Sequence, residues 1–218
     1  MHNNNAITQT ISIAVLAIPI AAYFLGSIPF GLILTRAFGH GDVRKVGSGN
    51  IGATNVARAA GLLAGVLTLM LDVAKGAGAV LLAEKLSNDS AAWMTIAALA
   101  ALLGHCFPIW LNFKGGKGVA TAAGMFFVLS PFAGLVALIL FLLVVIFWRY
   151  VSLGSVSAAA AMPLLIYFLW PRHAPPLAVT IGALAAALLI IYKHRGNLQR
   201  LVQGIEPKFS FSKNKETQ

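Results

Sequence analysis

The sequence is poor in charged side chains, and acidic residues are especially scarce. Charged residues make up 10% of the 218 residues, whereas hydrophobic residues make up 59%. Soluble domains carry about a quarter charged residues, so this composition excludes an ordinary water-soluble domain and favours a chain folded in a bilayer. The 6 acidic residues face 16 basic ones, and the formal net charge is +10. In a soluble protein this excess would indicate nucleic acid. Because the basic residues lie between apolar runs, we expect them to set topology and attract anions, with no nucleic-acid partner.

Cysteine is nearly absent. Cys106 is the one cysteine, so an intrachain disulfide is excluded. It follows His105, but two adjacent ligands without further partners are poor evidence for zinc. We therefore predict no metal and no cofactor, and we interpret Cys106 as a small apolar filler.

Long apolar runs dominate the remainder of the chain. A helix needs about 20 apolar residues to cross the hydrocarbon core. A seventh run, at 118–130, is short for a span, and Ser130-Pro131 separates it from the next one. It is either a short helix or a half-helix packed within the bundle. The six clear candidates are 11–37, 61–83, 91–111, 132–149, 154–170 and 175–193.

The distribution of basic residues favours seven crossings over six. With seven crossings and the N-terminus outside, all basic residues except Lys75, Lys85 and Arg172 fall on the cytosolic side. That bias places the C-terminus in the cytosol. We predict an all-α, polytopic helix bundle that forms one integral-membrane domain over residues 1–218, with a short basic tail at 197–218. The expected location is the bacterial inner membrane, with the polar loops facing the cytosol.

The first polar segment follows the first span and covers residues 47–58, with the sequence GSGNIGATNVAR. Its glycines allow backbone N–H groups to turn inward and form an anion-binding nest. Neutral donors stand beside an arginine whose planar fork matches phosphate oxygens. A flexible linker with a helix cap is the plainer interpretation, but it does not explain this mixture. The candidate phosphate ligands are Ser48, Asn50, Thr54, Asn55 and Arg58.

The second polar segment contains Gly-Gly between two lysines, just before a predicted helix. Backbone N–H groups, two ammonium groups and a helix N-terminus together resemble a phosphate cradle. The spacing of a Walker A motif is absent, which argues against an ATPase. Ordinary cytosolic lysines in a tight turn are the alternative, but they do not require Gly-Gly. The candidates are His105, Lys114, Gly115, Gly116, Lys117 and Gly118.

The third polar segment begins where the last span ends. A stop-transfer cluster explains Lys193 and Arg195 but not His194, Asn197 or Glu206. Apolar residues at helical spacing predict a short amphipathic helix on the membrane surface. We expect Glu206 to hold this helix to a basic partner.

Two further polar features lie inside predicted spans. Gly26-Ser27-Ile28-Pro29 should bend the first span, and Ser27 is expected to bond a backbone carbonyl as structural support. Asp72 and Lys75, at spacing i, i+3, should pair on one face of their helix. Ions inside a membrane span are by default a functional hypothesis, and an internal, neutralised pair that fixes helix packing is the alternative; we do not place the pair in the active site.

Several ordered segments resemble a known family. GSIPFG, GSGNIGATNVAR, LDVAKG, GHCFPIWLNFKGGKGVAT and KHRGNLQRLVQGIE are similar to the signature segments of the PlsY-type glycerol-3-phosphate acyltransferases, over about residues 23–208. The resemblance implies a seven-span membrane enzyme that moves an acyl group from acyl phosphate to the 1-hydroxyl of glycerol 3-phosphate. The products would be lysophosphatidic acid and inorganic phosphate. It also implies contact with membrane lipid and with the enzyme that supplies acyl phosphate.

The resemblance assigns the three polar segments to one catalytic site. Ser48, Lys117, His194 and His105 are then the candidate catalytic residues, while Asn197 joins the phosphate ligands. Acyl phosphate is already activated, so the enzyme mainly aligns two reactants and stabilises an oxyanion. We hypothesise that a substrate phosphate takes the hydroxyl proton; general-base catalysis by His105 or His194 is the alternative. A membrane anion transporter or channel is the rival class.

Overall fold

The structure is a computed structural model, and it describes residue 15 and residues 17–209. All regular elements in this part of the chain are helical, which confirms the all-α prediction. The first helix covers residues 17–27. The elements that follow it are α2 (Phe30–Ala37), the short 3-10 helix η1 (Val43–Lys45), α3 (Ala53–Ala60), α4 (Leu62–Leu86), α5 (Ala91–Cys106), η2 (Ile109–Leu111), α6 (Val119–Leu129), α7 (Pro131–Trp148), α8 (Val151–Leu169), η3 (Pro171–His173), α9 (Leu177–Lys193) and α10 (Arg195–Val202).

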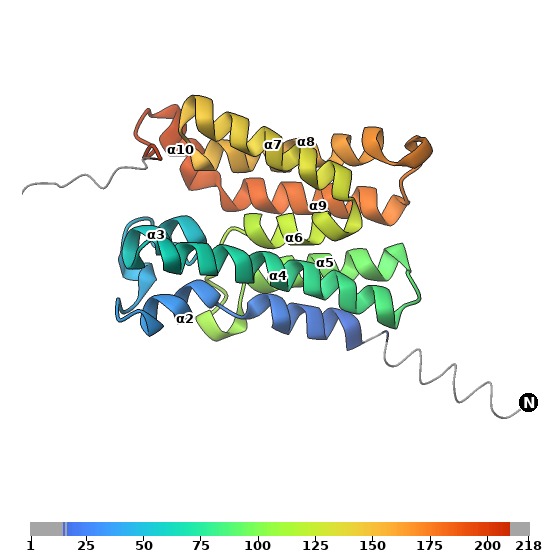
Figure 1. Ribbon diagram of the computed structural model, residues 1–218, viewed down its shortest axis with the longest axis horizontal. Helices are drawn as coiled ribbons and strands as arrows, with labels where there is room; N and C mark the ends of the chain where they lie inside the picture. The colour runs from blue at the N-terminus through green and yellow to red at the C-terminus, as the bar shows by residue number, and fades with distance from the viewer. Residues whose placement is uncertain (1–14, 16, 210–218) are drawn as a thin grey trace, which may run out of the picture.

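The long helices lie side by side along the longest axis of the molecule. Figure 1 shows α7, α8 and α9 on one side of the short helix α6, and α4, α5 and the first helix on the other. The most extensive packing joins α4 to α6, α7 to α8 and α3 to α4, followed by α8 to α9. Helices α3 and α10 lie at the same end of the bundle (Figure 1), so segments far apart in sequence meet there.

Helix lengths and composition are those of a membrane protein. Within residues 17–209, five helical segments are long and apolar enough to cross a bilayer, and the pair α9 and α10, bent by 57°, would make a sixth. Helix α6 has only 11 residues and ends at Leu129; Ser130 separates it from Pro131, the first residue of α7, as the sequence predicts. Large apolar side chains face outward, such as Phe132 and Phe147 on α7, which are 74% and 72% exposed. In water such a surface would aggregate, whereas lipid solvates it.

The first helix is broken at its inner end, as predicted. It stops at Ser27, and α2 begins at Phe30, after Pro29. The Ser27 hydroxyl donates to the Phe24 carbonyl at 2.8 Å and accepts from Trp110 Nε1 at 2.9 Å. Ser27 thus makes the bond to a backbone carbonyl that the sequence predicts, and its bond from Trp110 ties the break to η2.

Glycines allow α4 and α6 to touch through their backbones. A Cβ atom on Gly124 of α6 would lie 2.0 Å from the Val73 carbonyl oxygen, and one on Gly76 of α4 would lie 2.1 Å from the Thr121 carbonyl oxygen. Small residues at such crossings let membrane helices approach closely. This crossing fixes the position of α6, which has only 11 residues, and that of the loop before it.

Candidate active site

Asn55 organises the loop that precedes α3. Its amide nitrogen donates to the carbonyls of Val43, Val46 and Asn50 at 2.9–3.2 Å, and its Oδ1 accepts from the Ser48 N–H at 3.0 Å. The side chain is only 3% exposed. All three carbonyl bonds and the Ser48 bond are internal to the loop, so the geometry gives Asn55 a structural task rather than the phosphate contact we expected.

The glycine loop between α5 and α6 rests on the end of α5. The N–H groups of Gly116 and Gly115 donate to the carbonyls of His105 and Cys106 at 3.0 and 3.2 Å. A Cβ on Gly116 would lie 2.1 Å from His105 Nε2, and Gly118 has a positive φ of 83°. The glycines are therefore required by close packing and by the turn. The N–H groups of Gly115 and Gly116 are already used, which leaves them unavailable for the predicted phosphate cradle.

The third segment forms the predicted short helix, α10, and its residues are bonded into one network. Residues 197–202 therefore belong to a helix rather than to a tail, and the final residues, 210–218, lie outside the described part. Glu206 Oε1 accepts from Ser152 Oγ and from Asn197 Nδ2, each at 2.6 Å. Its Oε2 accepts from Arg200 Nε at 2.8 Å, which confirms the predicted link to a basic partner. Burial alone would raise the pKa of Glu206, but these hydrogen bonds outweigh it and hold the pKa below its usual value.

Lys117 joins this network across the bundle. Its ammonium group donates to Asn197 Oδ1, and because Glu206 holds the amide nitrogen of Asn197, the amide oxygen is turned toward the lysine. Burial lowers the pKa of Lys117 to about 8, although the nearby Glu206 carboxylate opposes that change. The loop after α5 and the helix α10 are thus locked together through one ammonium group.

His194 follows the last residue of α9 and is only 3% exposed. Its Nδ1 bonds to the Ile190 carbonyl oxygen at 2.8 Å, and a carbonyl only accepts, so Nδ1 carries the proton. In the neutral ring, Nε2 is then the acceptor. Burial lowers the pKa of His194 to about 4, so the ring stays neutral at physiological pH.

These residues line one long cavity, with a volume of about 430 Å³, that combines a polar end with an apolar groove. Of the predicted residues, it collects Ser48, Asn50, Thr54, Asn55, Arg58, His105, Lys117, Gly118, His194, Asn197 and Glu206. Its apolar walls come from α6, α7 and α8 and include Phe126, Phe127, Ala137, Phe141, Ala158 and Met162. The long cavity therefore offers a cationic, hydrogen-bonding end and a hydrocarbon-lined extension in one continuous space.

The predicted intramembrane ion pair exists, but its location is not the one we expected. Asp72 Oδ1 lies 2.9 Å from Lys75 Nζ, which confirms the pairing. The same oxygen lies 3.6 Å from His105 Nδ1, and both Asp72 and His105 line the long cavity. Lys75 also donates to the Ile28 carbonyl at 3.0 Å, which ties the pair to the break in the first helix. Placing the pair outside the site was wrong for Asp72, because α5 brings His105 against it.

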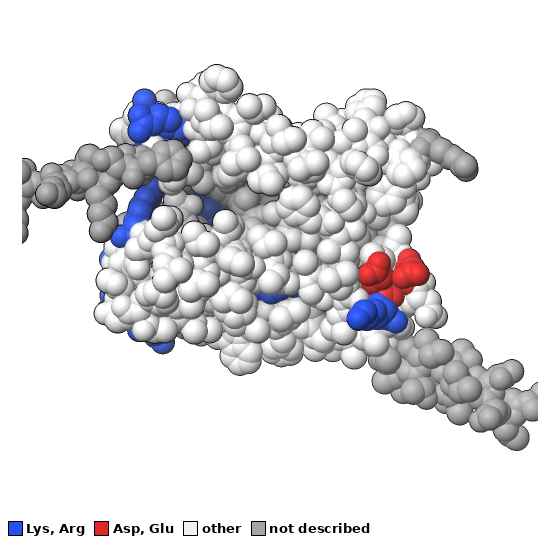
Figure 2. Space-filling model, viewed as in Figure 1, with Lys and Arg blue, Asp and Glu red and all other residues white. Residues whose placement is uncertain are grey.

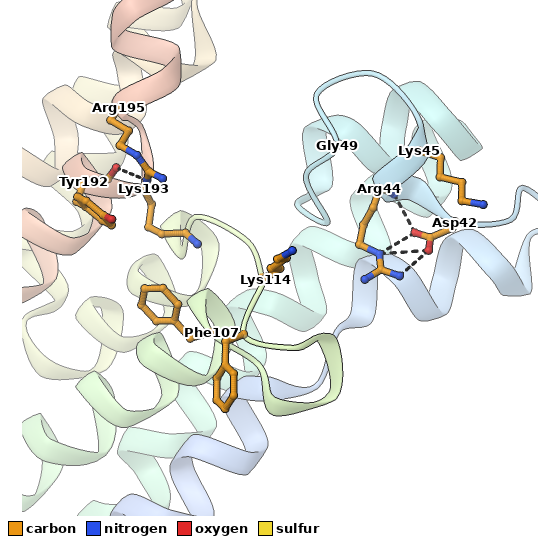
Figure 3. Close-up of a pocket in the computed structure, with 11 residues that line it drawn as sticks. Asp42, Arg44, Lys45, Gly49, Phe107, Lys114, Tyr192, Lys193 and Arg195 are labelled. Atoms are coloured by element: carbon orange, nitrogen blue, oxygen red, sulfur yellow. Dashed lines mark hydrogen bonds and ion pairs between the residues drawn. The ribbon is translucent and has the colours of Figure 1, made fainter.

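A second cavity, the basic cavity, lies beside the first and has a volume of about 620 Å³. The structure places Lys114 and Gly115 here rather than with Lys117. Figure 3 shows Lys114 between two groups of side chains, with Asp42, Arg44 and Lys45 on one side and Phe107, Tyr192, Lys193 and Arg195 on the other. Gly49 and Phe113 complete the lining. Figure 2 shows basic side chains at this end of the bundle, whereas the flank facing the viewer is almost free of charge.

Several residues of the long cavity were not predicted. Ser152 and Ser155 of α8 line it, as does Arg200 of α10. The two serines are spaced i, i+3 in an apolar helix, which is a signal that sequence reasoning could have used. The apolar groove carried no such signal, because Phe and Ala in a span are equally suited to lipid and to a ligand.

Fold and cavity together define an integral membrane protein built to hold an anionic polar group next to a hydrocarbon chain. A glycerol-3-phosphate acyltransferase family model matches residues 16–204. A glycerol-3-phosphate acyltransferase of Syntrophotalea carbinolica is 53% identical over 190 residues, covering 87% of this chain and 95% of that protein. One of Trichlorobacter lovleyi is 52% identical over 190 residues, covering 86% and 94%.

Solved structures point to the same family as these sequence matches. A crystal structure of PlsY (YgiH), an integral membrane glycerol 3-phosphate acyltransferase in its glycerol 3-phosphate form, superposes with a TM-score of 0.84 at 41% identity. The match covers 90% of this chain and 96% of that one. The lysophosphatidic acid form matches with a TM-score of 0.81 at 40% identity, over 90% of this chain and 95% of that one. The chain therefore belongs to the glycerol-3-phosphate acyltransferase family.

Proposed function

We propose that this protein transfers a fatty acyl group from acyl phosphate to the 1-hydroxyl of glycerol 3-phosphate, and releases lysophosphatidic acid and inorganic phosphate. The observation that carries the proposal is the long cavity, in which Lys117, Arg58 and His194 stand at the mouth of a groove walled by Phe126, Ala158 and Met162. A phosphate-bearing polar substrate fits the first part, and an acyl chain fits the second. Family membership agrees with this reaction.

The reaction requires alignment and charge stabilisation more than a strong base. The substrate hydroxyl oxygen bonds to the acyl carbonyl carbon, the acyl–phosphate bond breaks, and the hydroxyl proton ends on the departing phosphate. His194, neutral with Nε2 as acceptor, can hold the hydroxyl in line. A group with a pKa of about 4 is a weak base, so the phosphate, not His194, is the final proton acceptor in this mechanism. Lys117 and Ser48 polarise the phosphate and carbonyl oxygens.

We further propose seven crossings, counting α6 with the N-terminal segment, α4, α5, α7, α8 and α9. In this topology the N-terminus is outside, and α3, α10 and the glycine loop face the cytosol of a bacterium, in its inner membrane. The concentration of basic side chains at that end of the bundle supports this orientation. That face also suits delivery of acyl phosphate by the enzyme that makes it.

The direct test is turnover by the purified protein. With palmitoyl phosphate and glycerol 3-phosphate, we expect equal amounts of lysophosphatidic acid and inorganic phosphate, measured by mass spectrometry and phosphate release. Folded protein that forms neither product would overturn the proposal. The rival, an anion transporter, predicts instead that proteoliposomes accumulate labelled phosphate without acyl donor; we expect no such uptake above empty liposomes.

The pH dependence should follow Lys117. Because its pKa is lowered to about 8, kcat/KM should decline as pH rises through about 8 and the ammonium group loses its proton. Replacing Glu206 with glutamine removes a carboxylate that favours the charged lysine, so the decline should move to lower pH. We expect no change in kcat/KM near pH 6.5, since His194 stays neutral down to about pH 4. If kcat/KM did change near pH 6.5, and the change disappeared in His194→Ala, a histidine base would be favoured and the mechanism contradicted.

The groove should set the acyl-chain length. Ala158 lies partway along α8 and lines the long cavity, so Ala158→Leu is expected to narrow the space beyond the polar end. Activity with 16-carbon acyl phosphate should fall about tenfold, since a misfit of one methylene group in an apolar pocket costs about 1–3 kcal/mol, while an 8-carbon donor should be nearly unaffected. Leu164→Phe, on the same helix but 63% exposed, adds bulk outside the groove and is the matched control. Equal losses with both donors would show general damage instead.

A further inference from the structure

The basic cavity gathers five cationic side chains from three separate segments. Arg44 and Lys45 come from η1, Lys114 from the glycine loop, and Lys193 and Arg195 from the junction of α9 and α10. Among the described residues, Asp42 is the one carboxylate that lines the basic cavity, and the hydrogen-bonded Arg44 guanidinium holds the pKa of Asp42 at about 2. The carboxylate is thus ionised at any working pH, and the cavity keeps a clear excess of positive charge.

The five cationic side chains of the basic cavity differ in their contacts. Arg44 is bound to Asp42 through Nε and Nη2. Lys193 donates to the Cys106 carbonyl at 3.0 Å and lies 4.7 Å from the Phe107 ring centre, while Arg195 lies 4.5 Å from the Tyr192 ring centre. Among the described residues, no side-chain bond is formed by the ammonium groups of Lys45 and Lys114. Figure 3 shows Lys114 in the space between the two sides, without a bond to either.

The basic cavity and the long cavity lie back to back on the same three segments. In the first segment Gly49 lines the basic cavity, and its neighbours Ser48 and Asn50 line the long one. In the third segment, Lys193 lines the basic cavity and His194 lines the long one. In the second, Lys114 and Gly115 line the basic cavity, and Lys117 and Gly118 the long one. The residues that line the basic cavity are therefore within a few residues in sequence of Ser48, Lys117 and His194 in the long cavity.

We propose that the basic cavity is an outer binding site for a soluble phosphate monoester, which here captures glycerol 3-phosphate before it enters the long cavity. This inference rests on the proposed function. Clustered cations on low-dielectric walls raise the local concentration of an anionic substrate and its rate of association. Acyl phosphate carries a hydrocarbon chain that suits the apolar groove of the long cavity, so the outer site serves only the soluble substrate.

The kinetic test removes the two uncommitted ammonium groups in Lys45→Gln/Lys114→Gln. At low salt, kcat/KM for glycerol 3-phosphate should fall about tenfold, with kcat and the KM for acyl phosphate retained. At about 0.5 M salt, where screening shortens the Debye length to a few ångströms, the variant and the wild type should converge. Arg36→Gln/Lys208→Gln removes the same charge from exposed positions outside both cavities and is the control. Equal behaviour of the two double variants, or a loss confined to kcat, would overturn the proposal.

A lipid headgroup offers the same phosphate chemistry, so the assay is run in two kinds of nanodisc. If Lys45→Gln/Lys114→Gln lowers kcat/KM in purely zwitterionic bilayers, the ligand of the basic cavity is the soluble substrate. If the variant lowers kcat/KM only in bilayers with anionic lipid, the cavity binds lipid headgroups and the proposal is overturned. Calorimetric titration with glycerol 3-phosphate, without donor, is independent of turnover. We expect two sites per chain in the wild type and one in Lys45→Gln/Lys114→Gln. A single site in both excludes the outer site even if the enzyme is active, whereas two sites without product would reject the proposed function alone.

Discussion

Replacing Lys117 with methionine is expected to lower kcat/KM by about 100- to 1000-fold, the usual cost of removing a preorganised donor from a reaction centre. Lys117 supplies the one ammonium group among the described residues that line the long cavity. Methionine keeps most of the volume of the side chain, so the loss reports the charge and its hydrogen bonds. Burial makes the group effective, because charge interactions strengthen where water is excluded.

Lys114→Met is the matched control, because it makes the same change three residues away in the same loop. Lys114 lines the basic cavity, so its loss should weaken capture of glycerol 3-phosphate about tenfold at most and leave kcat intact. Measuring kcat and KM for each substrate in both variants separates the two roles. If both lysines cost the same in kcat, the division of the loop between two cavities does not describe the working enzyme.

That division marks the limit of what the sequence predicts. Spacing alone made Lys114 and Lys117 equivalent, since both flank the same Gly-Gly pair. They separate because Gly115 and Gly116 bond to the carbonyls of Cys106 and His105, a contact between segments that fixes which way each lysine faces. Local patterns carry no information on such a contact until α5 and the loop are placed together.

The helices themselves were well predicted, because their apolar runs are long. The expected spans at 61–83 and 175–193 correspond to α4 and α9 within a few residues, and the break at Ser130-Pro131 is present. The span expected at 154–170 begins earlier, at Val151, and the additional turn brings Ser152 into contact with Glu206. The seven-crossing topology stays a prediction, since five or six helical segments meet the length of a span.

Buried polar residues were the harder problem. Asn55 looked like a phosphate ligand because amides are common ones, but three carbonyls of its own loop occupy its donors. Asp72 looked like one half of an internal ion pair with Lys75, but α5 also places His105 beside it at the wall of the long cavity. In each case the residue type was identified correctly, and its role depended on neighbours from other segments.

The second large effect is expected from Gly124→Ala, which adds a single methyl group at the contact between α4 and α6. Gly124→Ala places a Cβ atom 2.0 Å from the Val73 carbonyl oxygen, where ordinary contact needs at least 3.4 Å, so α4 and α6 must move apart by more than an ångström. We expect a loss of about 3 kcal/mol, at the upper end for overpacking, because backbone rather than a flexible side chain is in the way. The melting temperature should fall by several degrees or more.

Activity should fall further than stability alone explains, because Lys117 lies in the glycine loop two residues before α6 begins. At a temperature where Gly124→Ala is still fully folded, displacement of about 1 Å is expected to reduce kcat roughly 100-fold. Gly78→Ala is the control: it lies on α4, and its Cβ would meet only Leu25 Cδ2, at 3.8 Å. There alanine should be neutral or stabilise the helix by about 0.5–1 kcal/mol. If Gly124→Ala and Gly78→Ala had the same melting temperature and the same kcat, the α4–α6 crossing would not position the glycine loop. The hydrogen bonds between the loop and α5 would then position it instead.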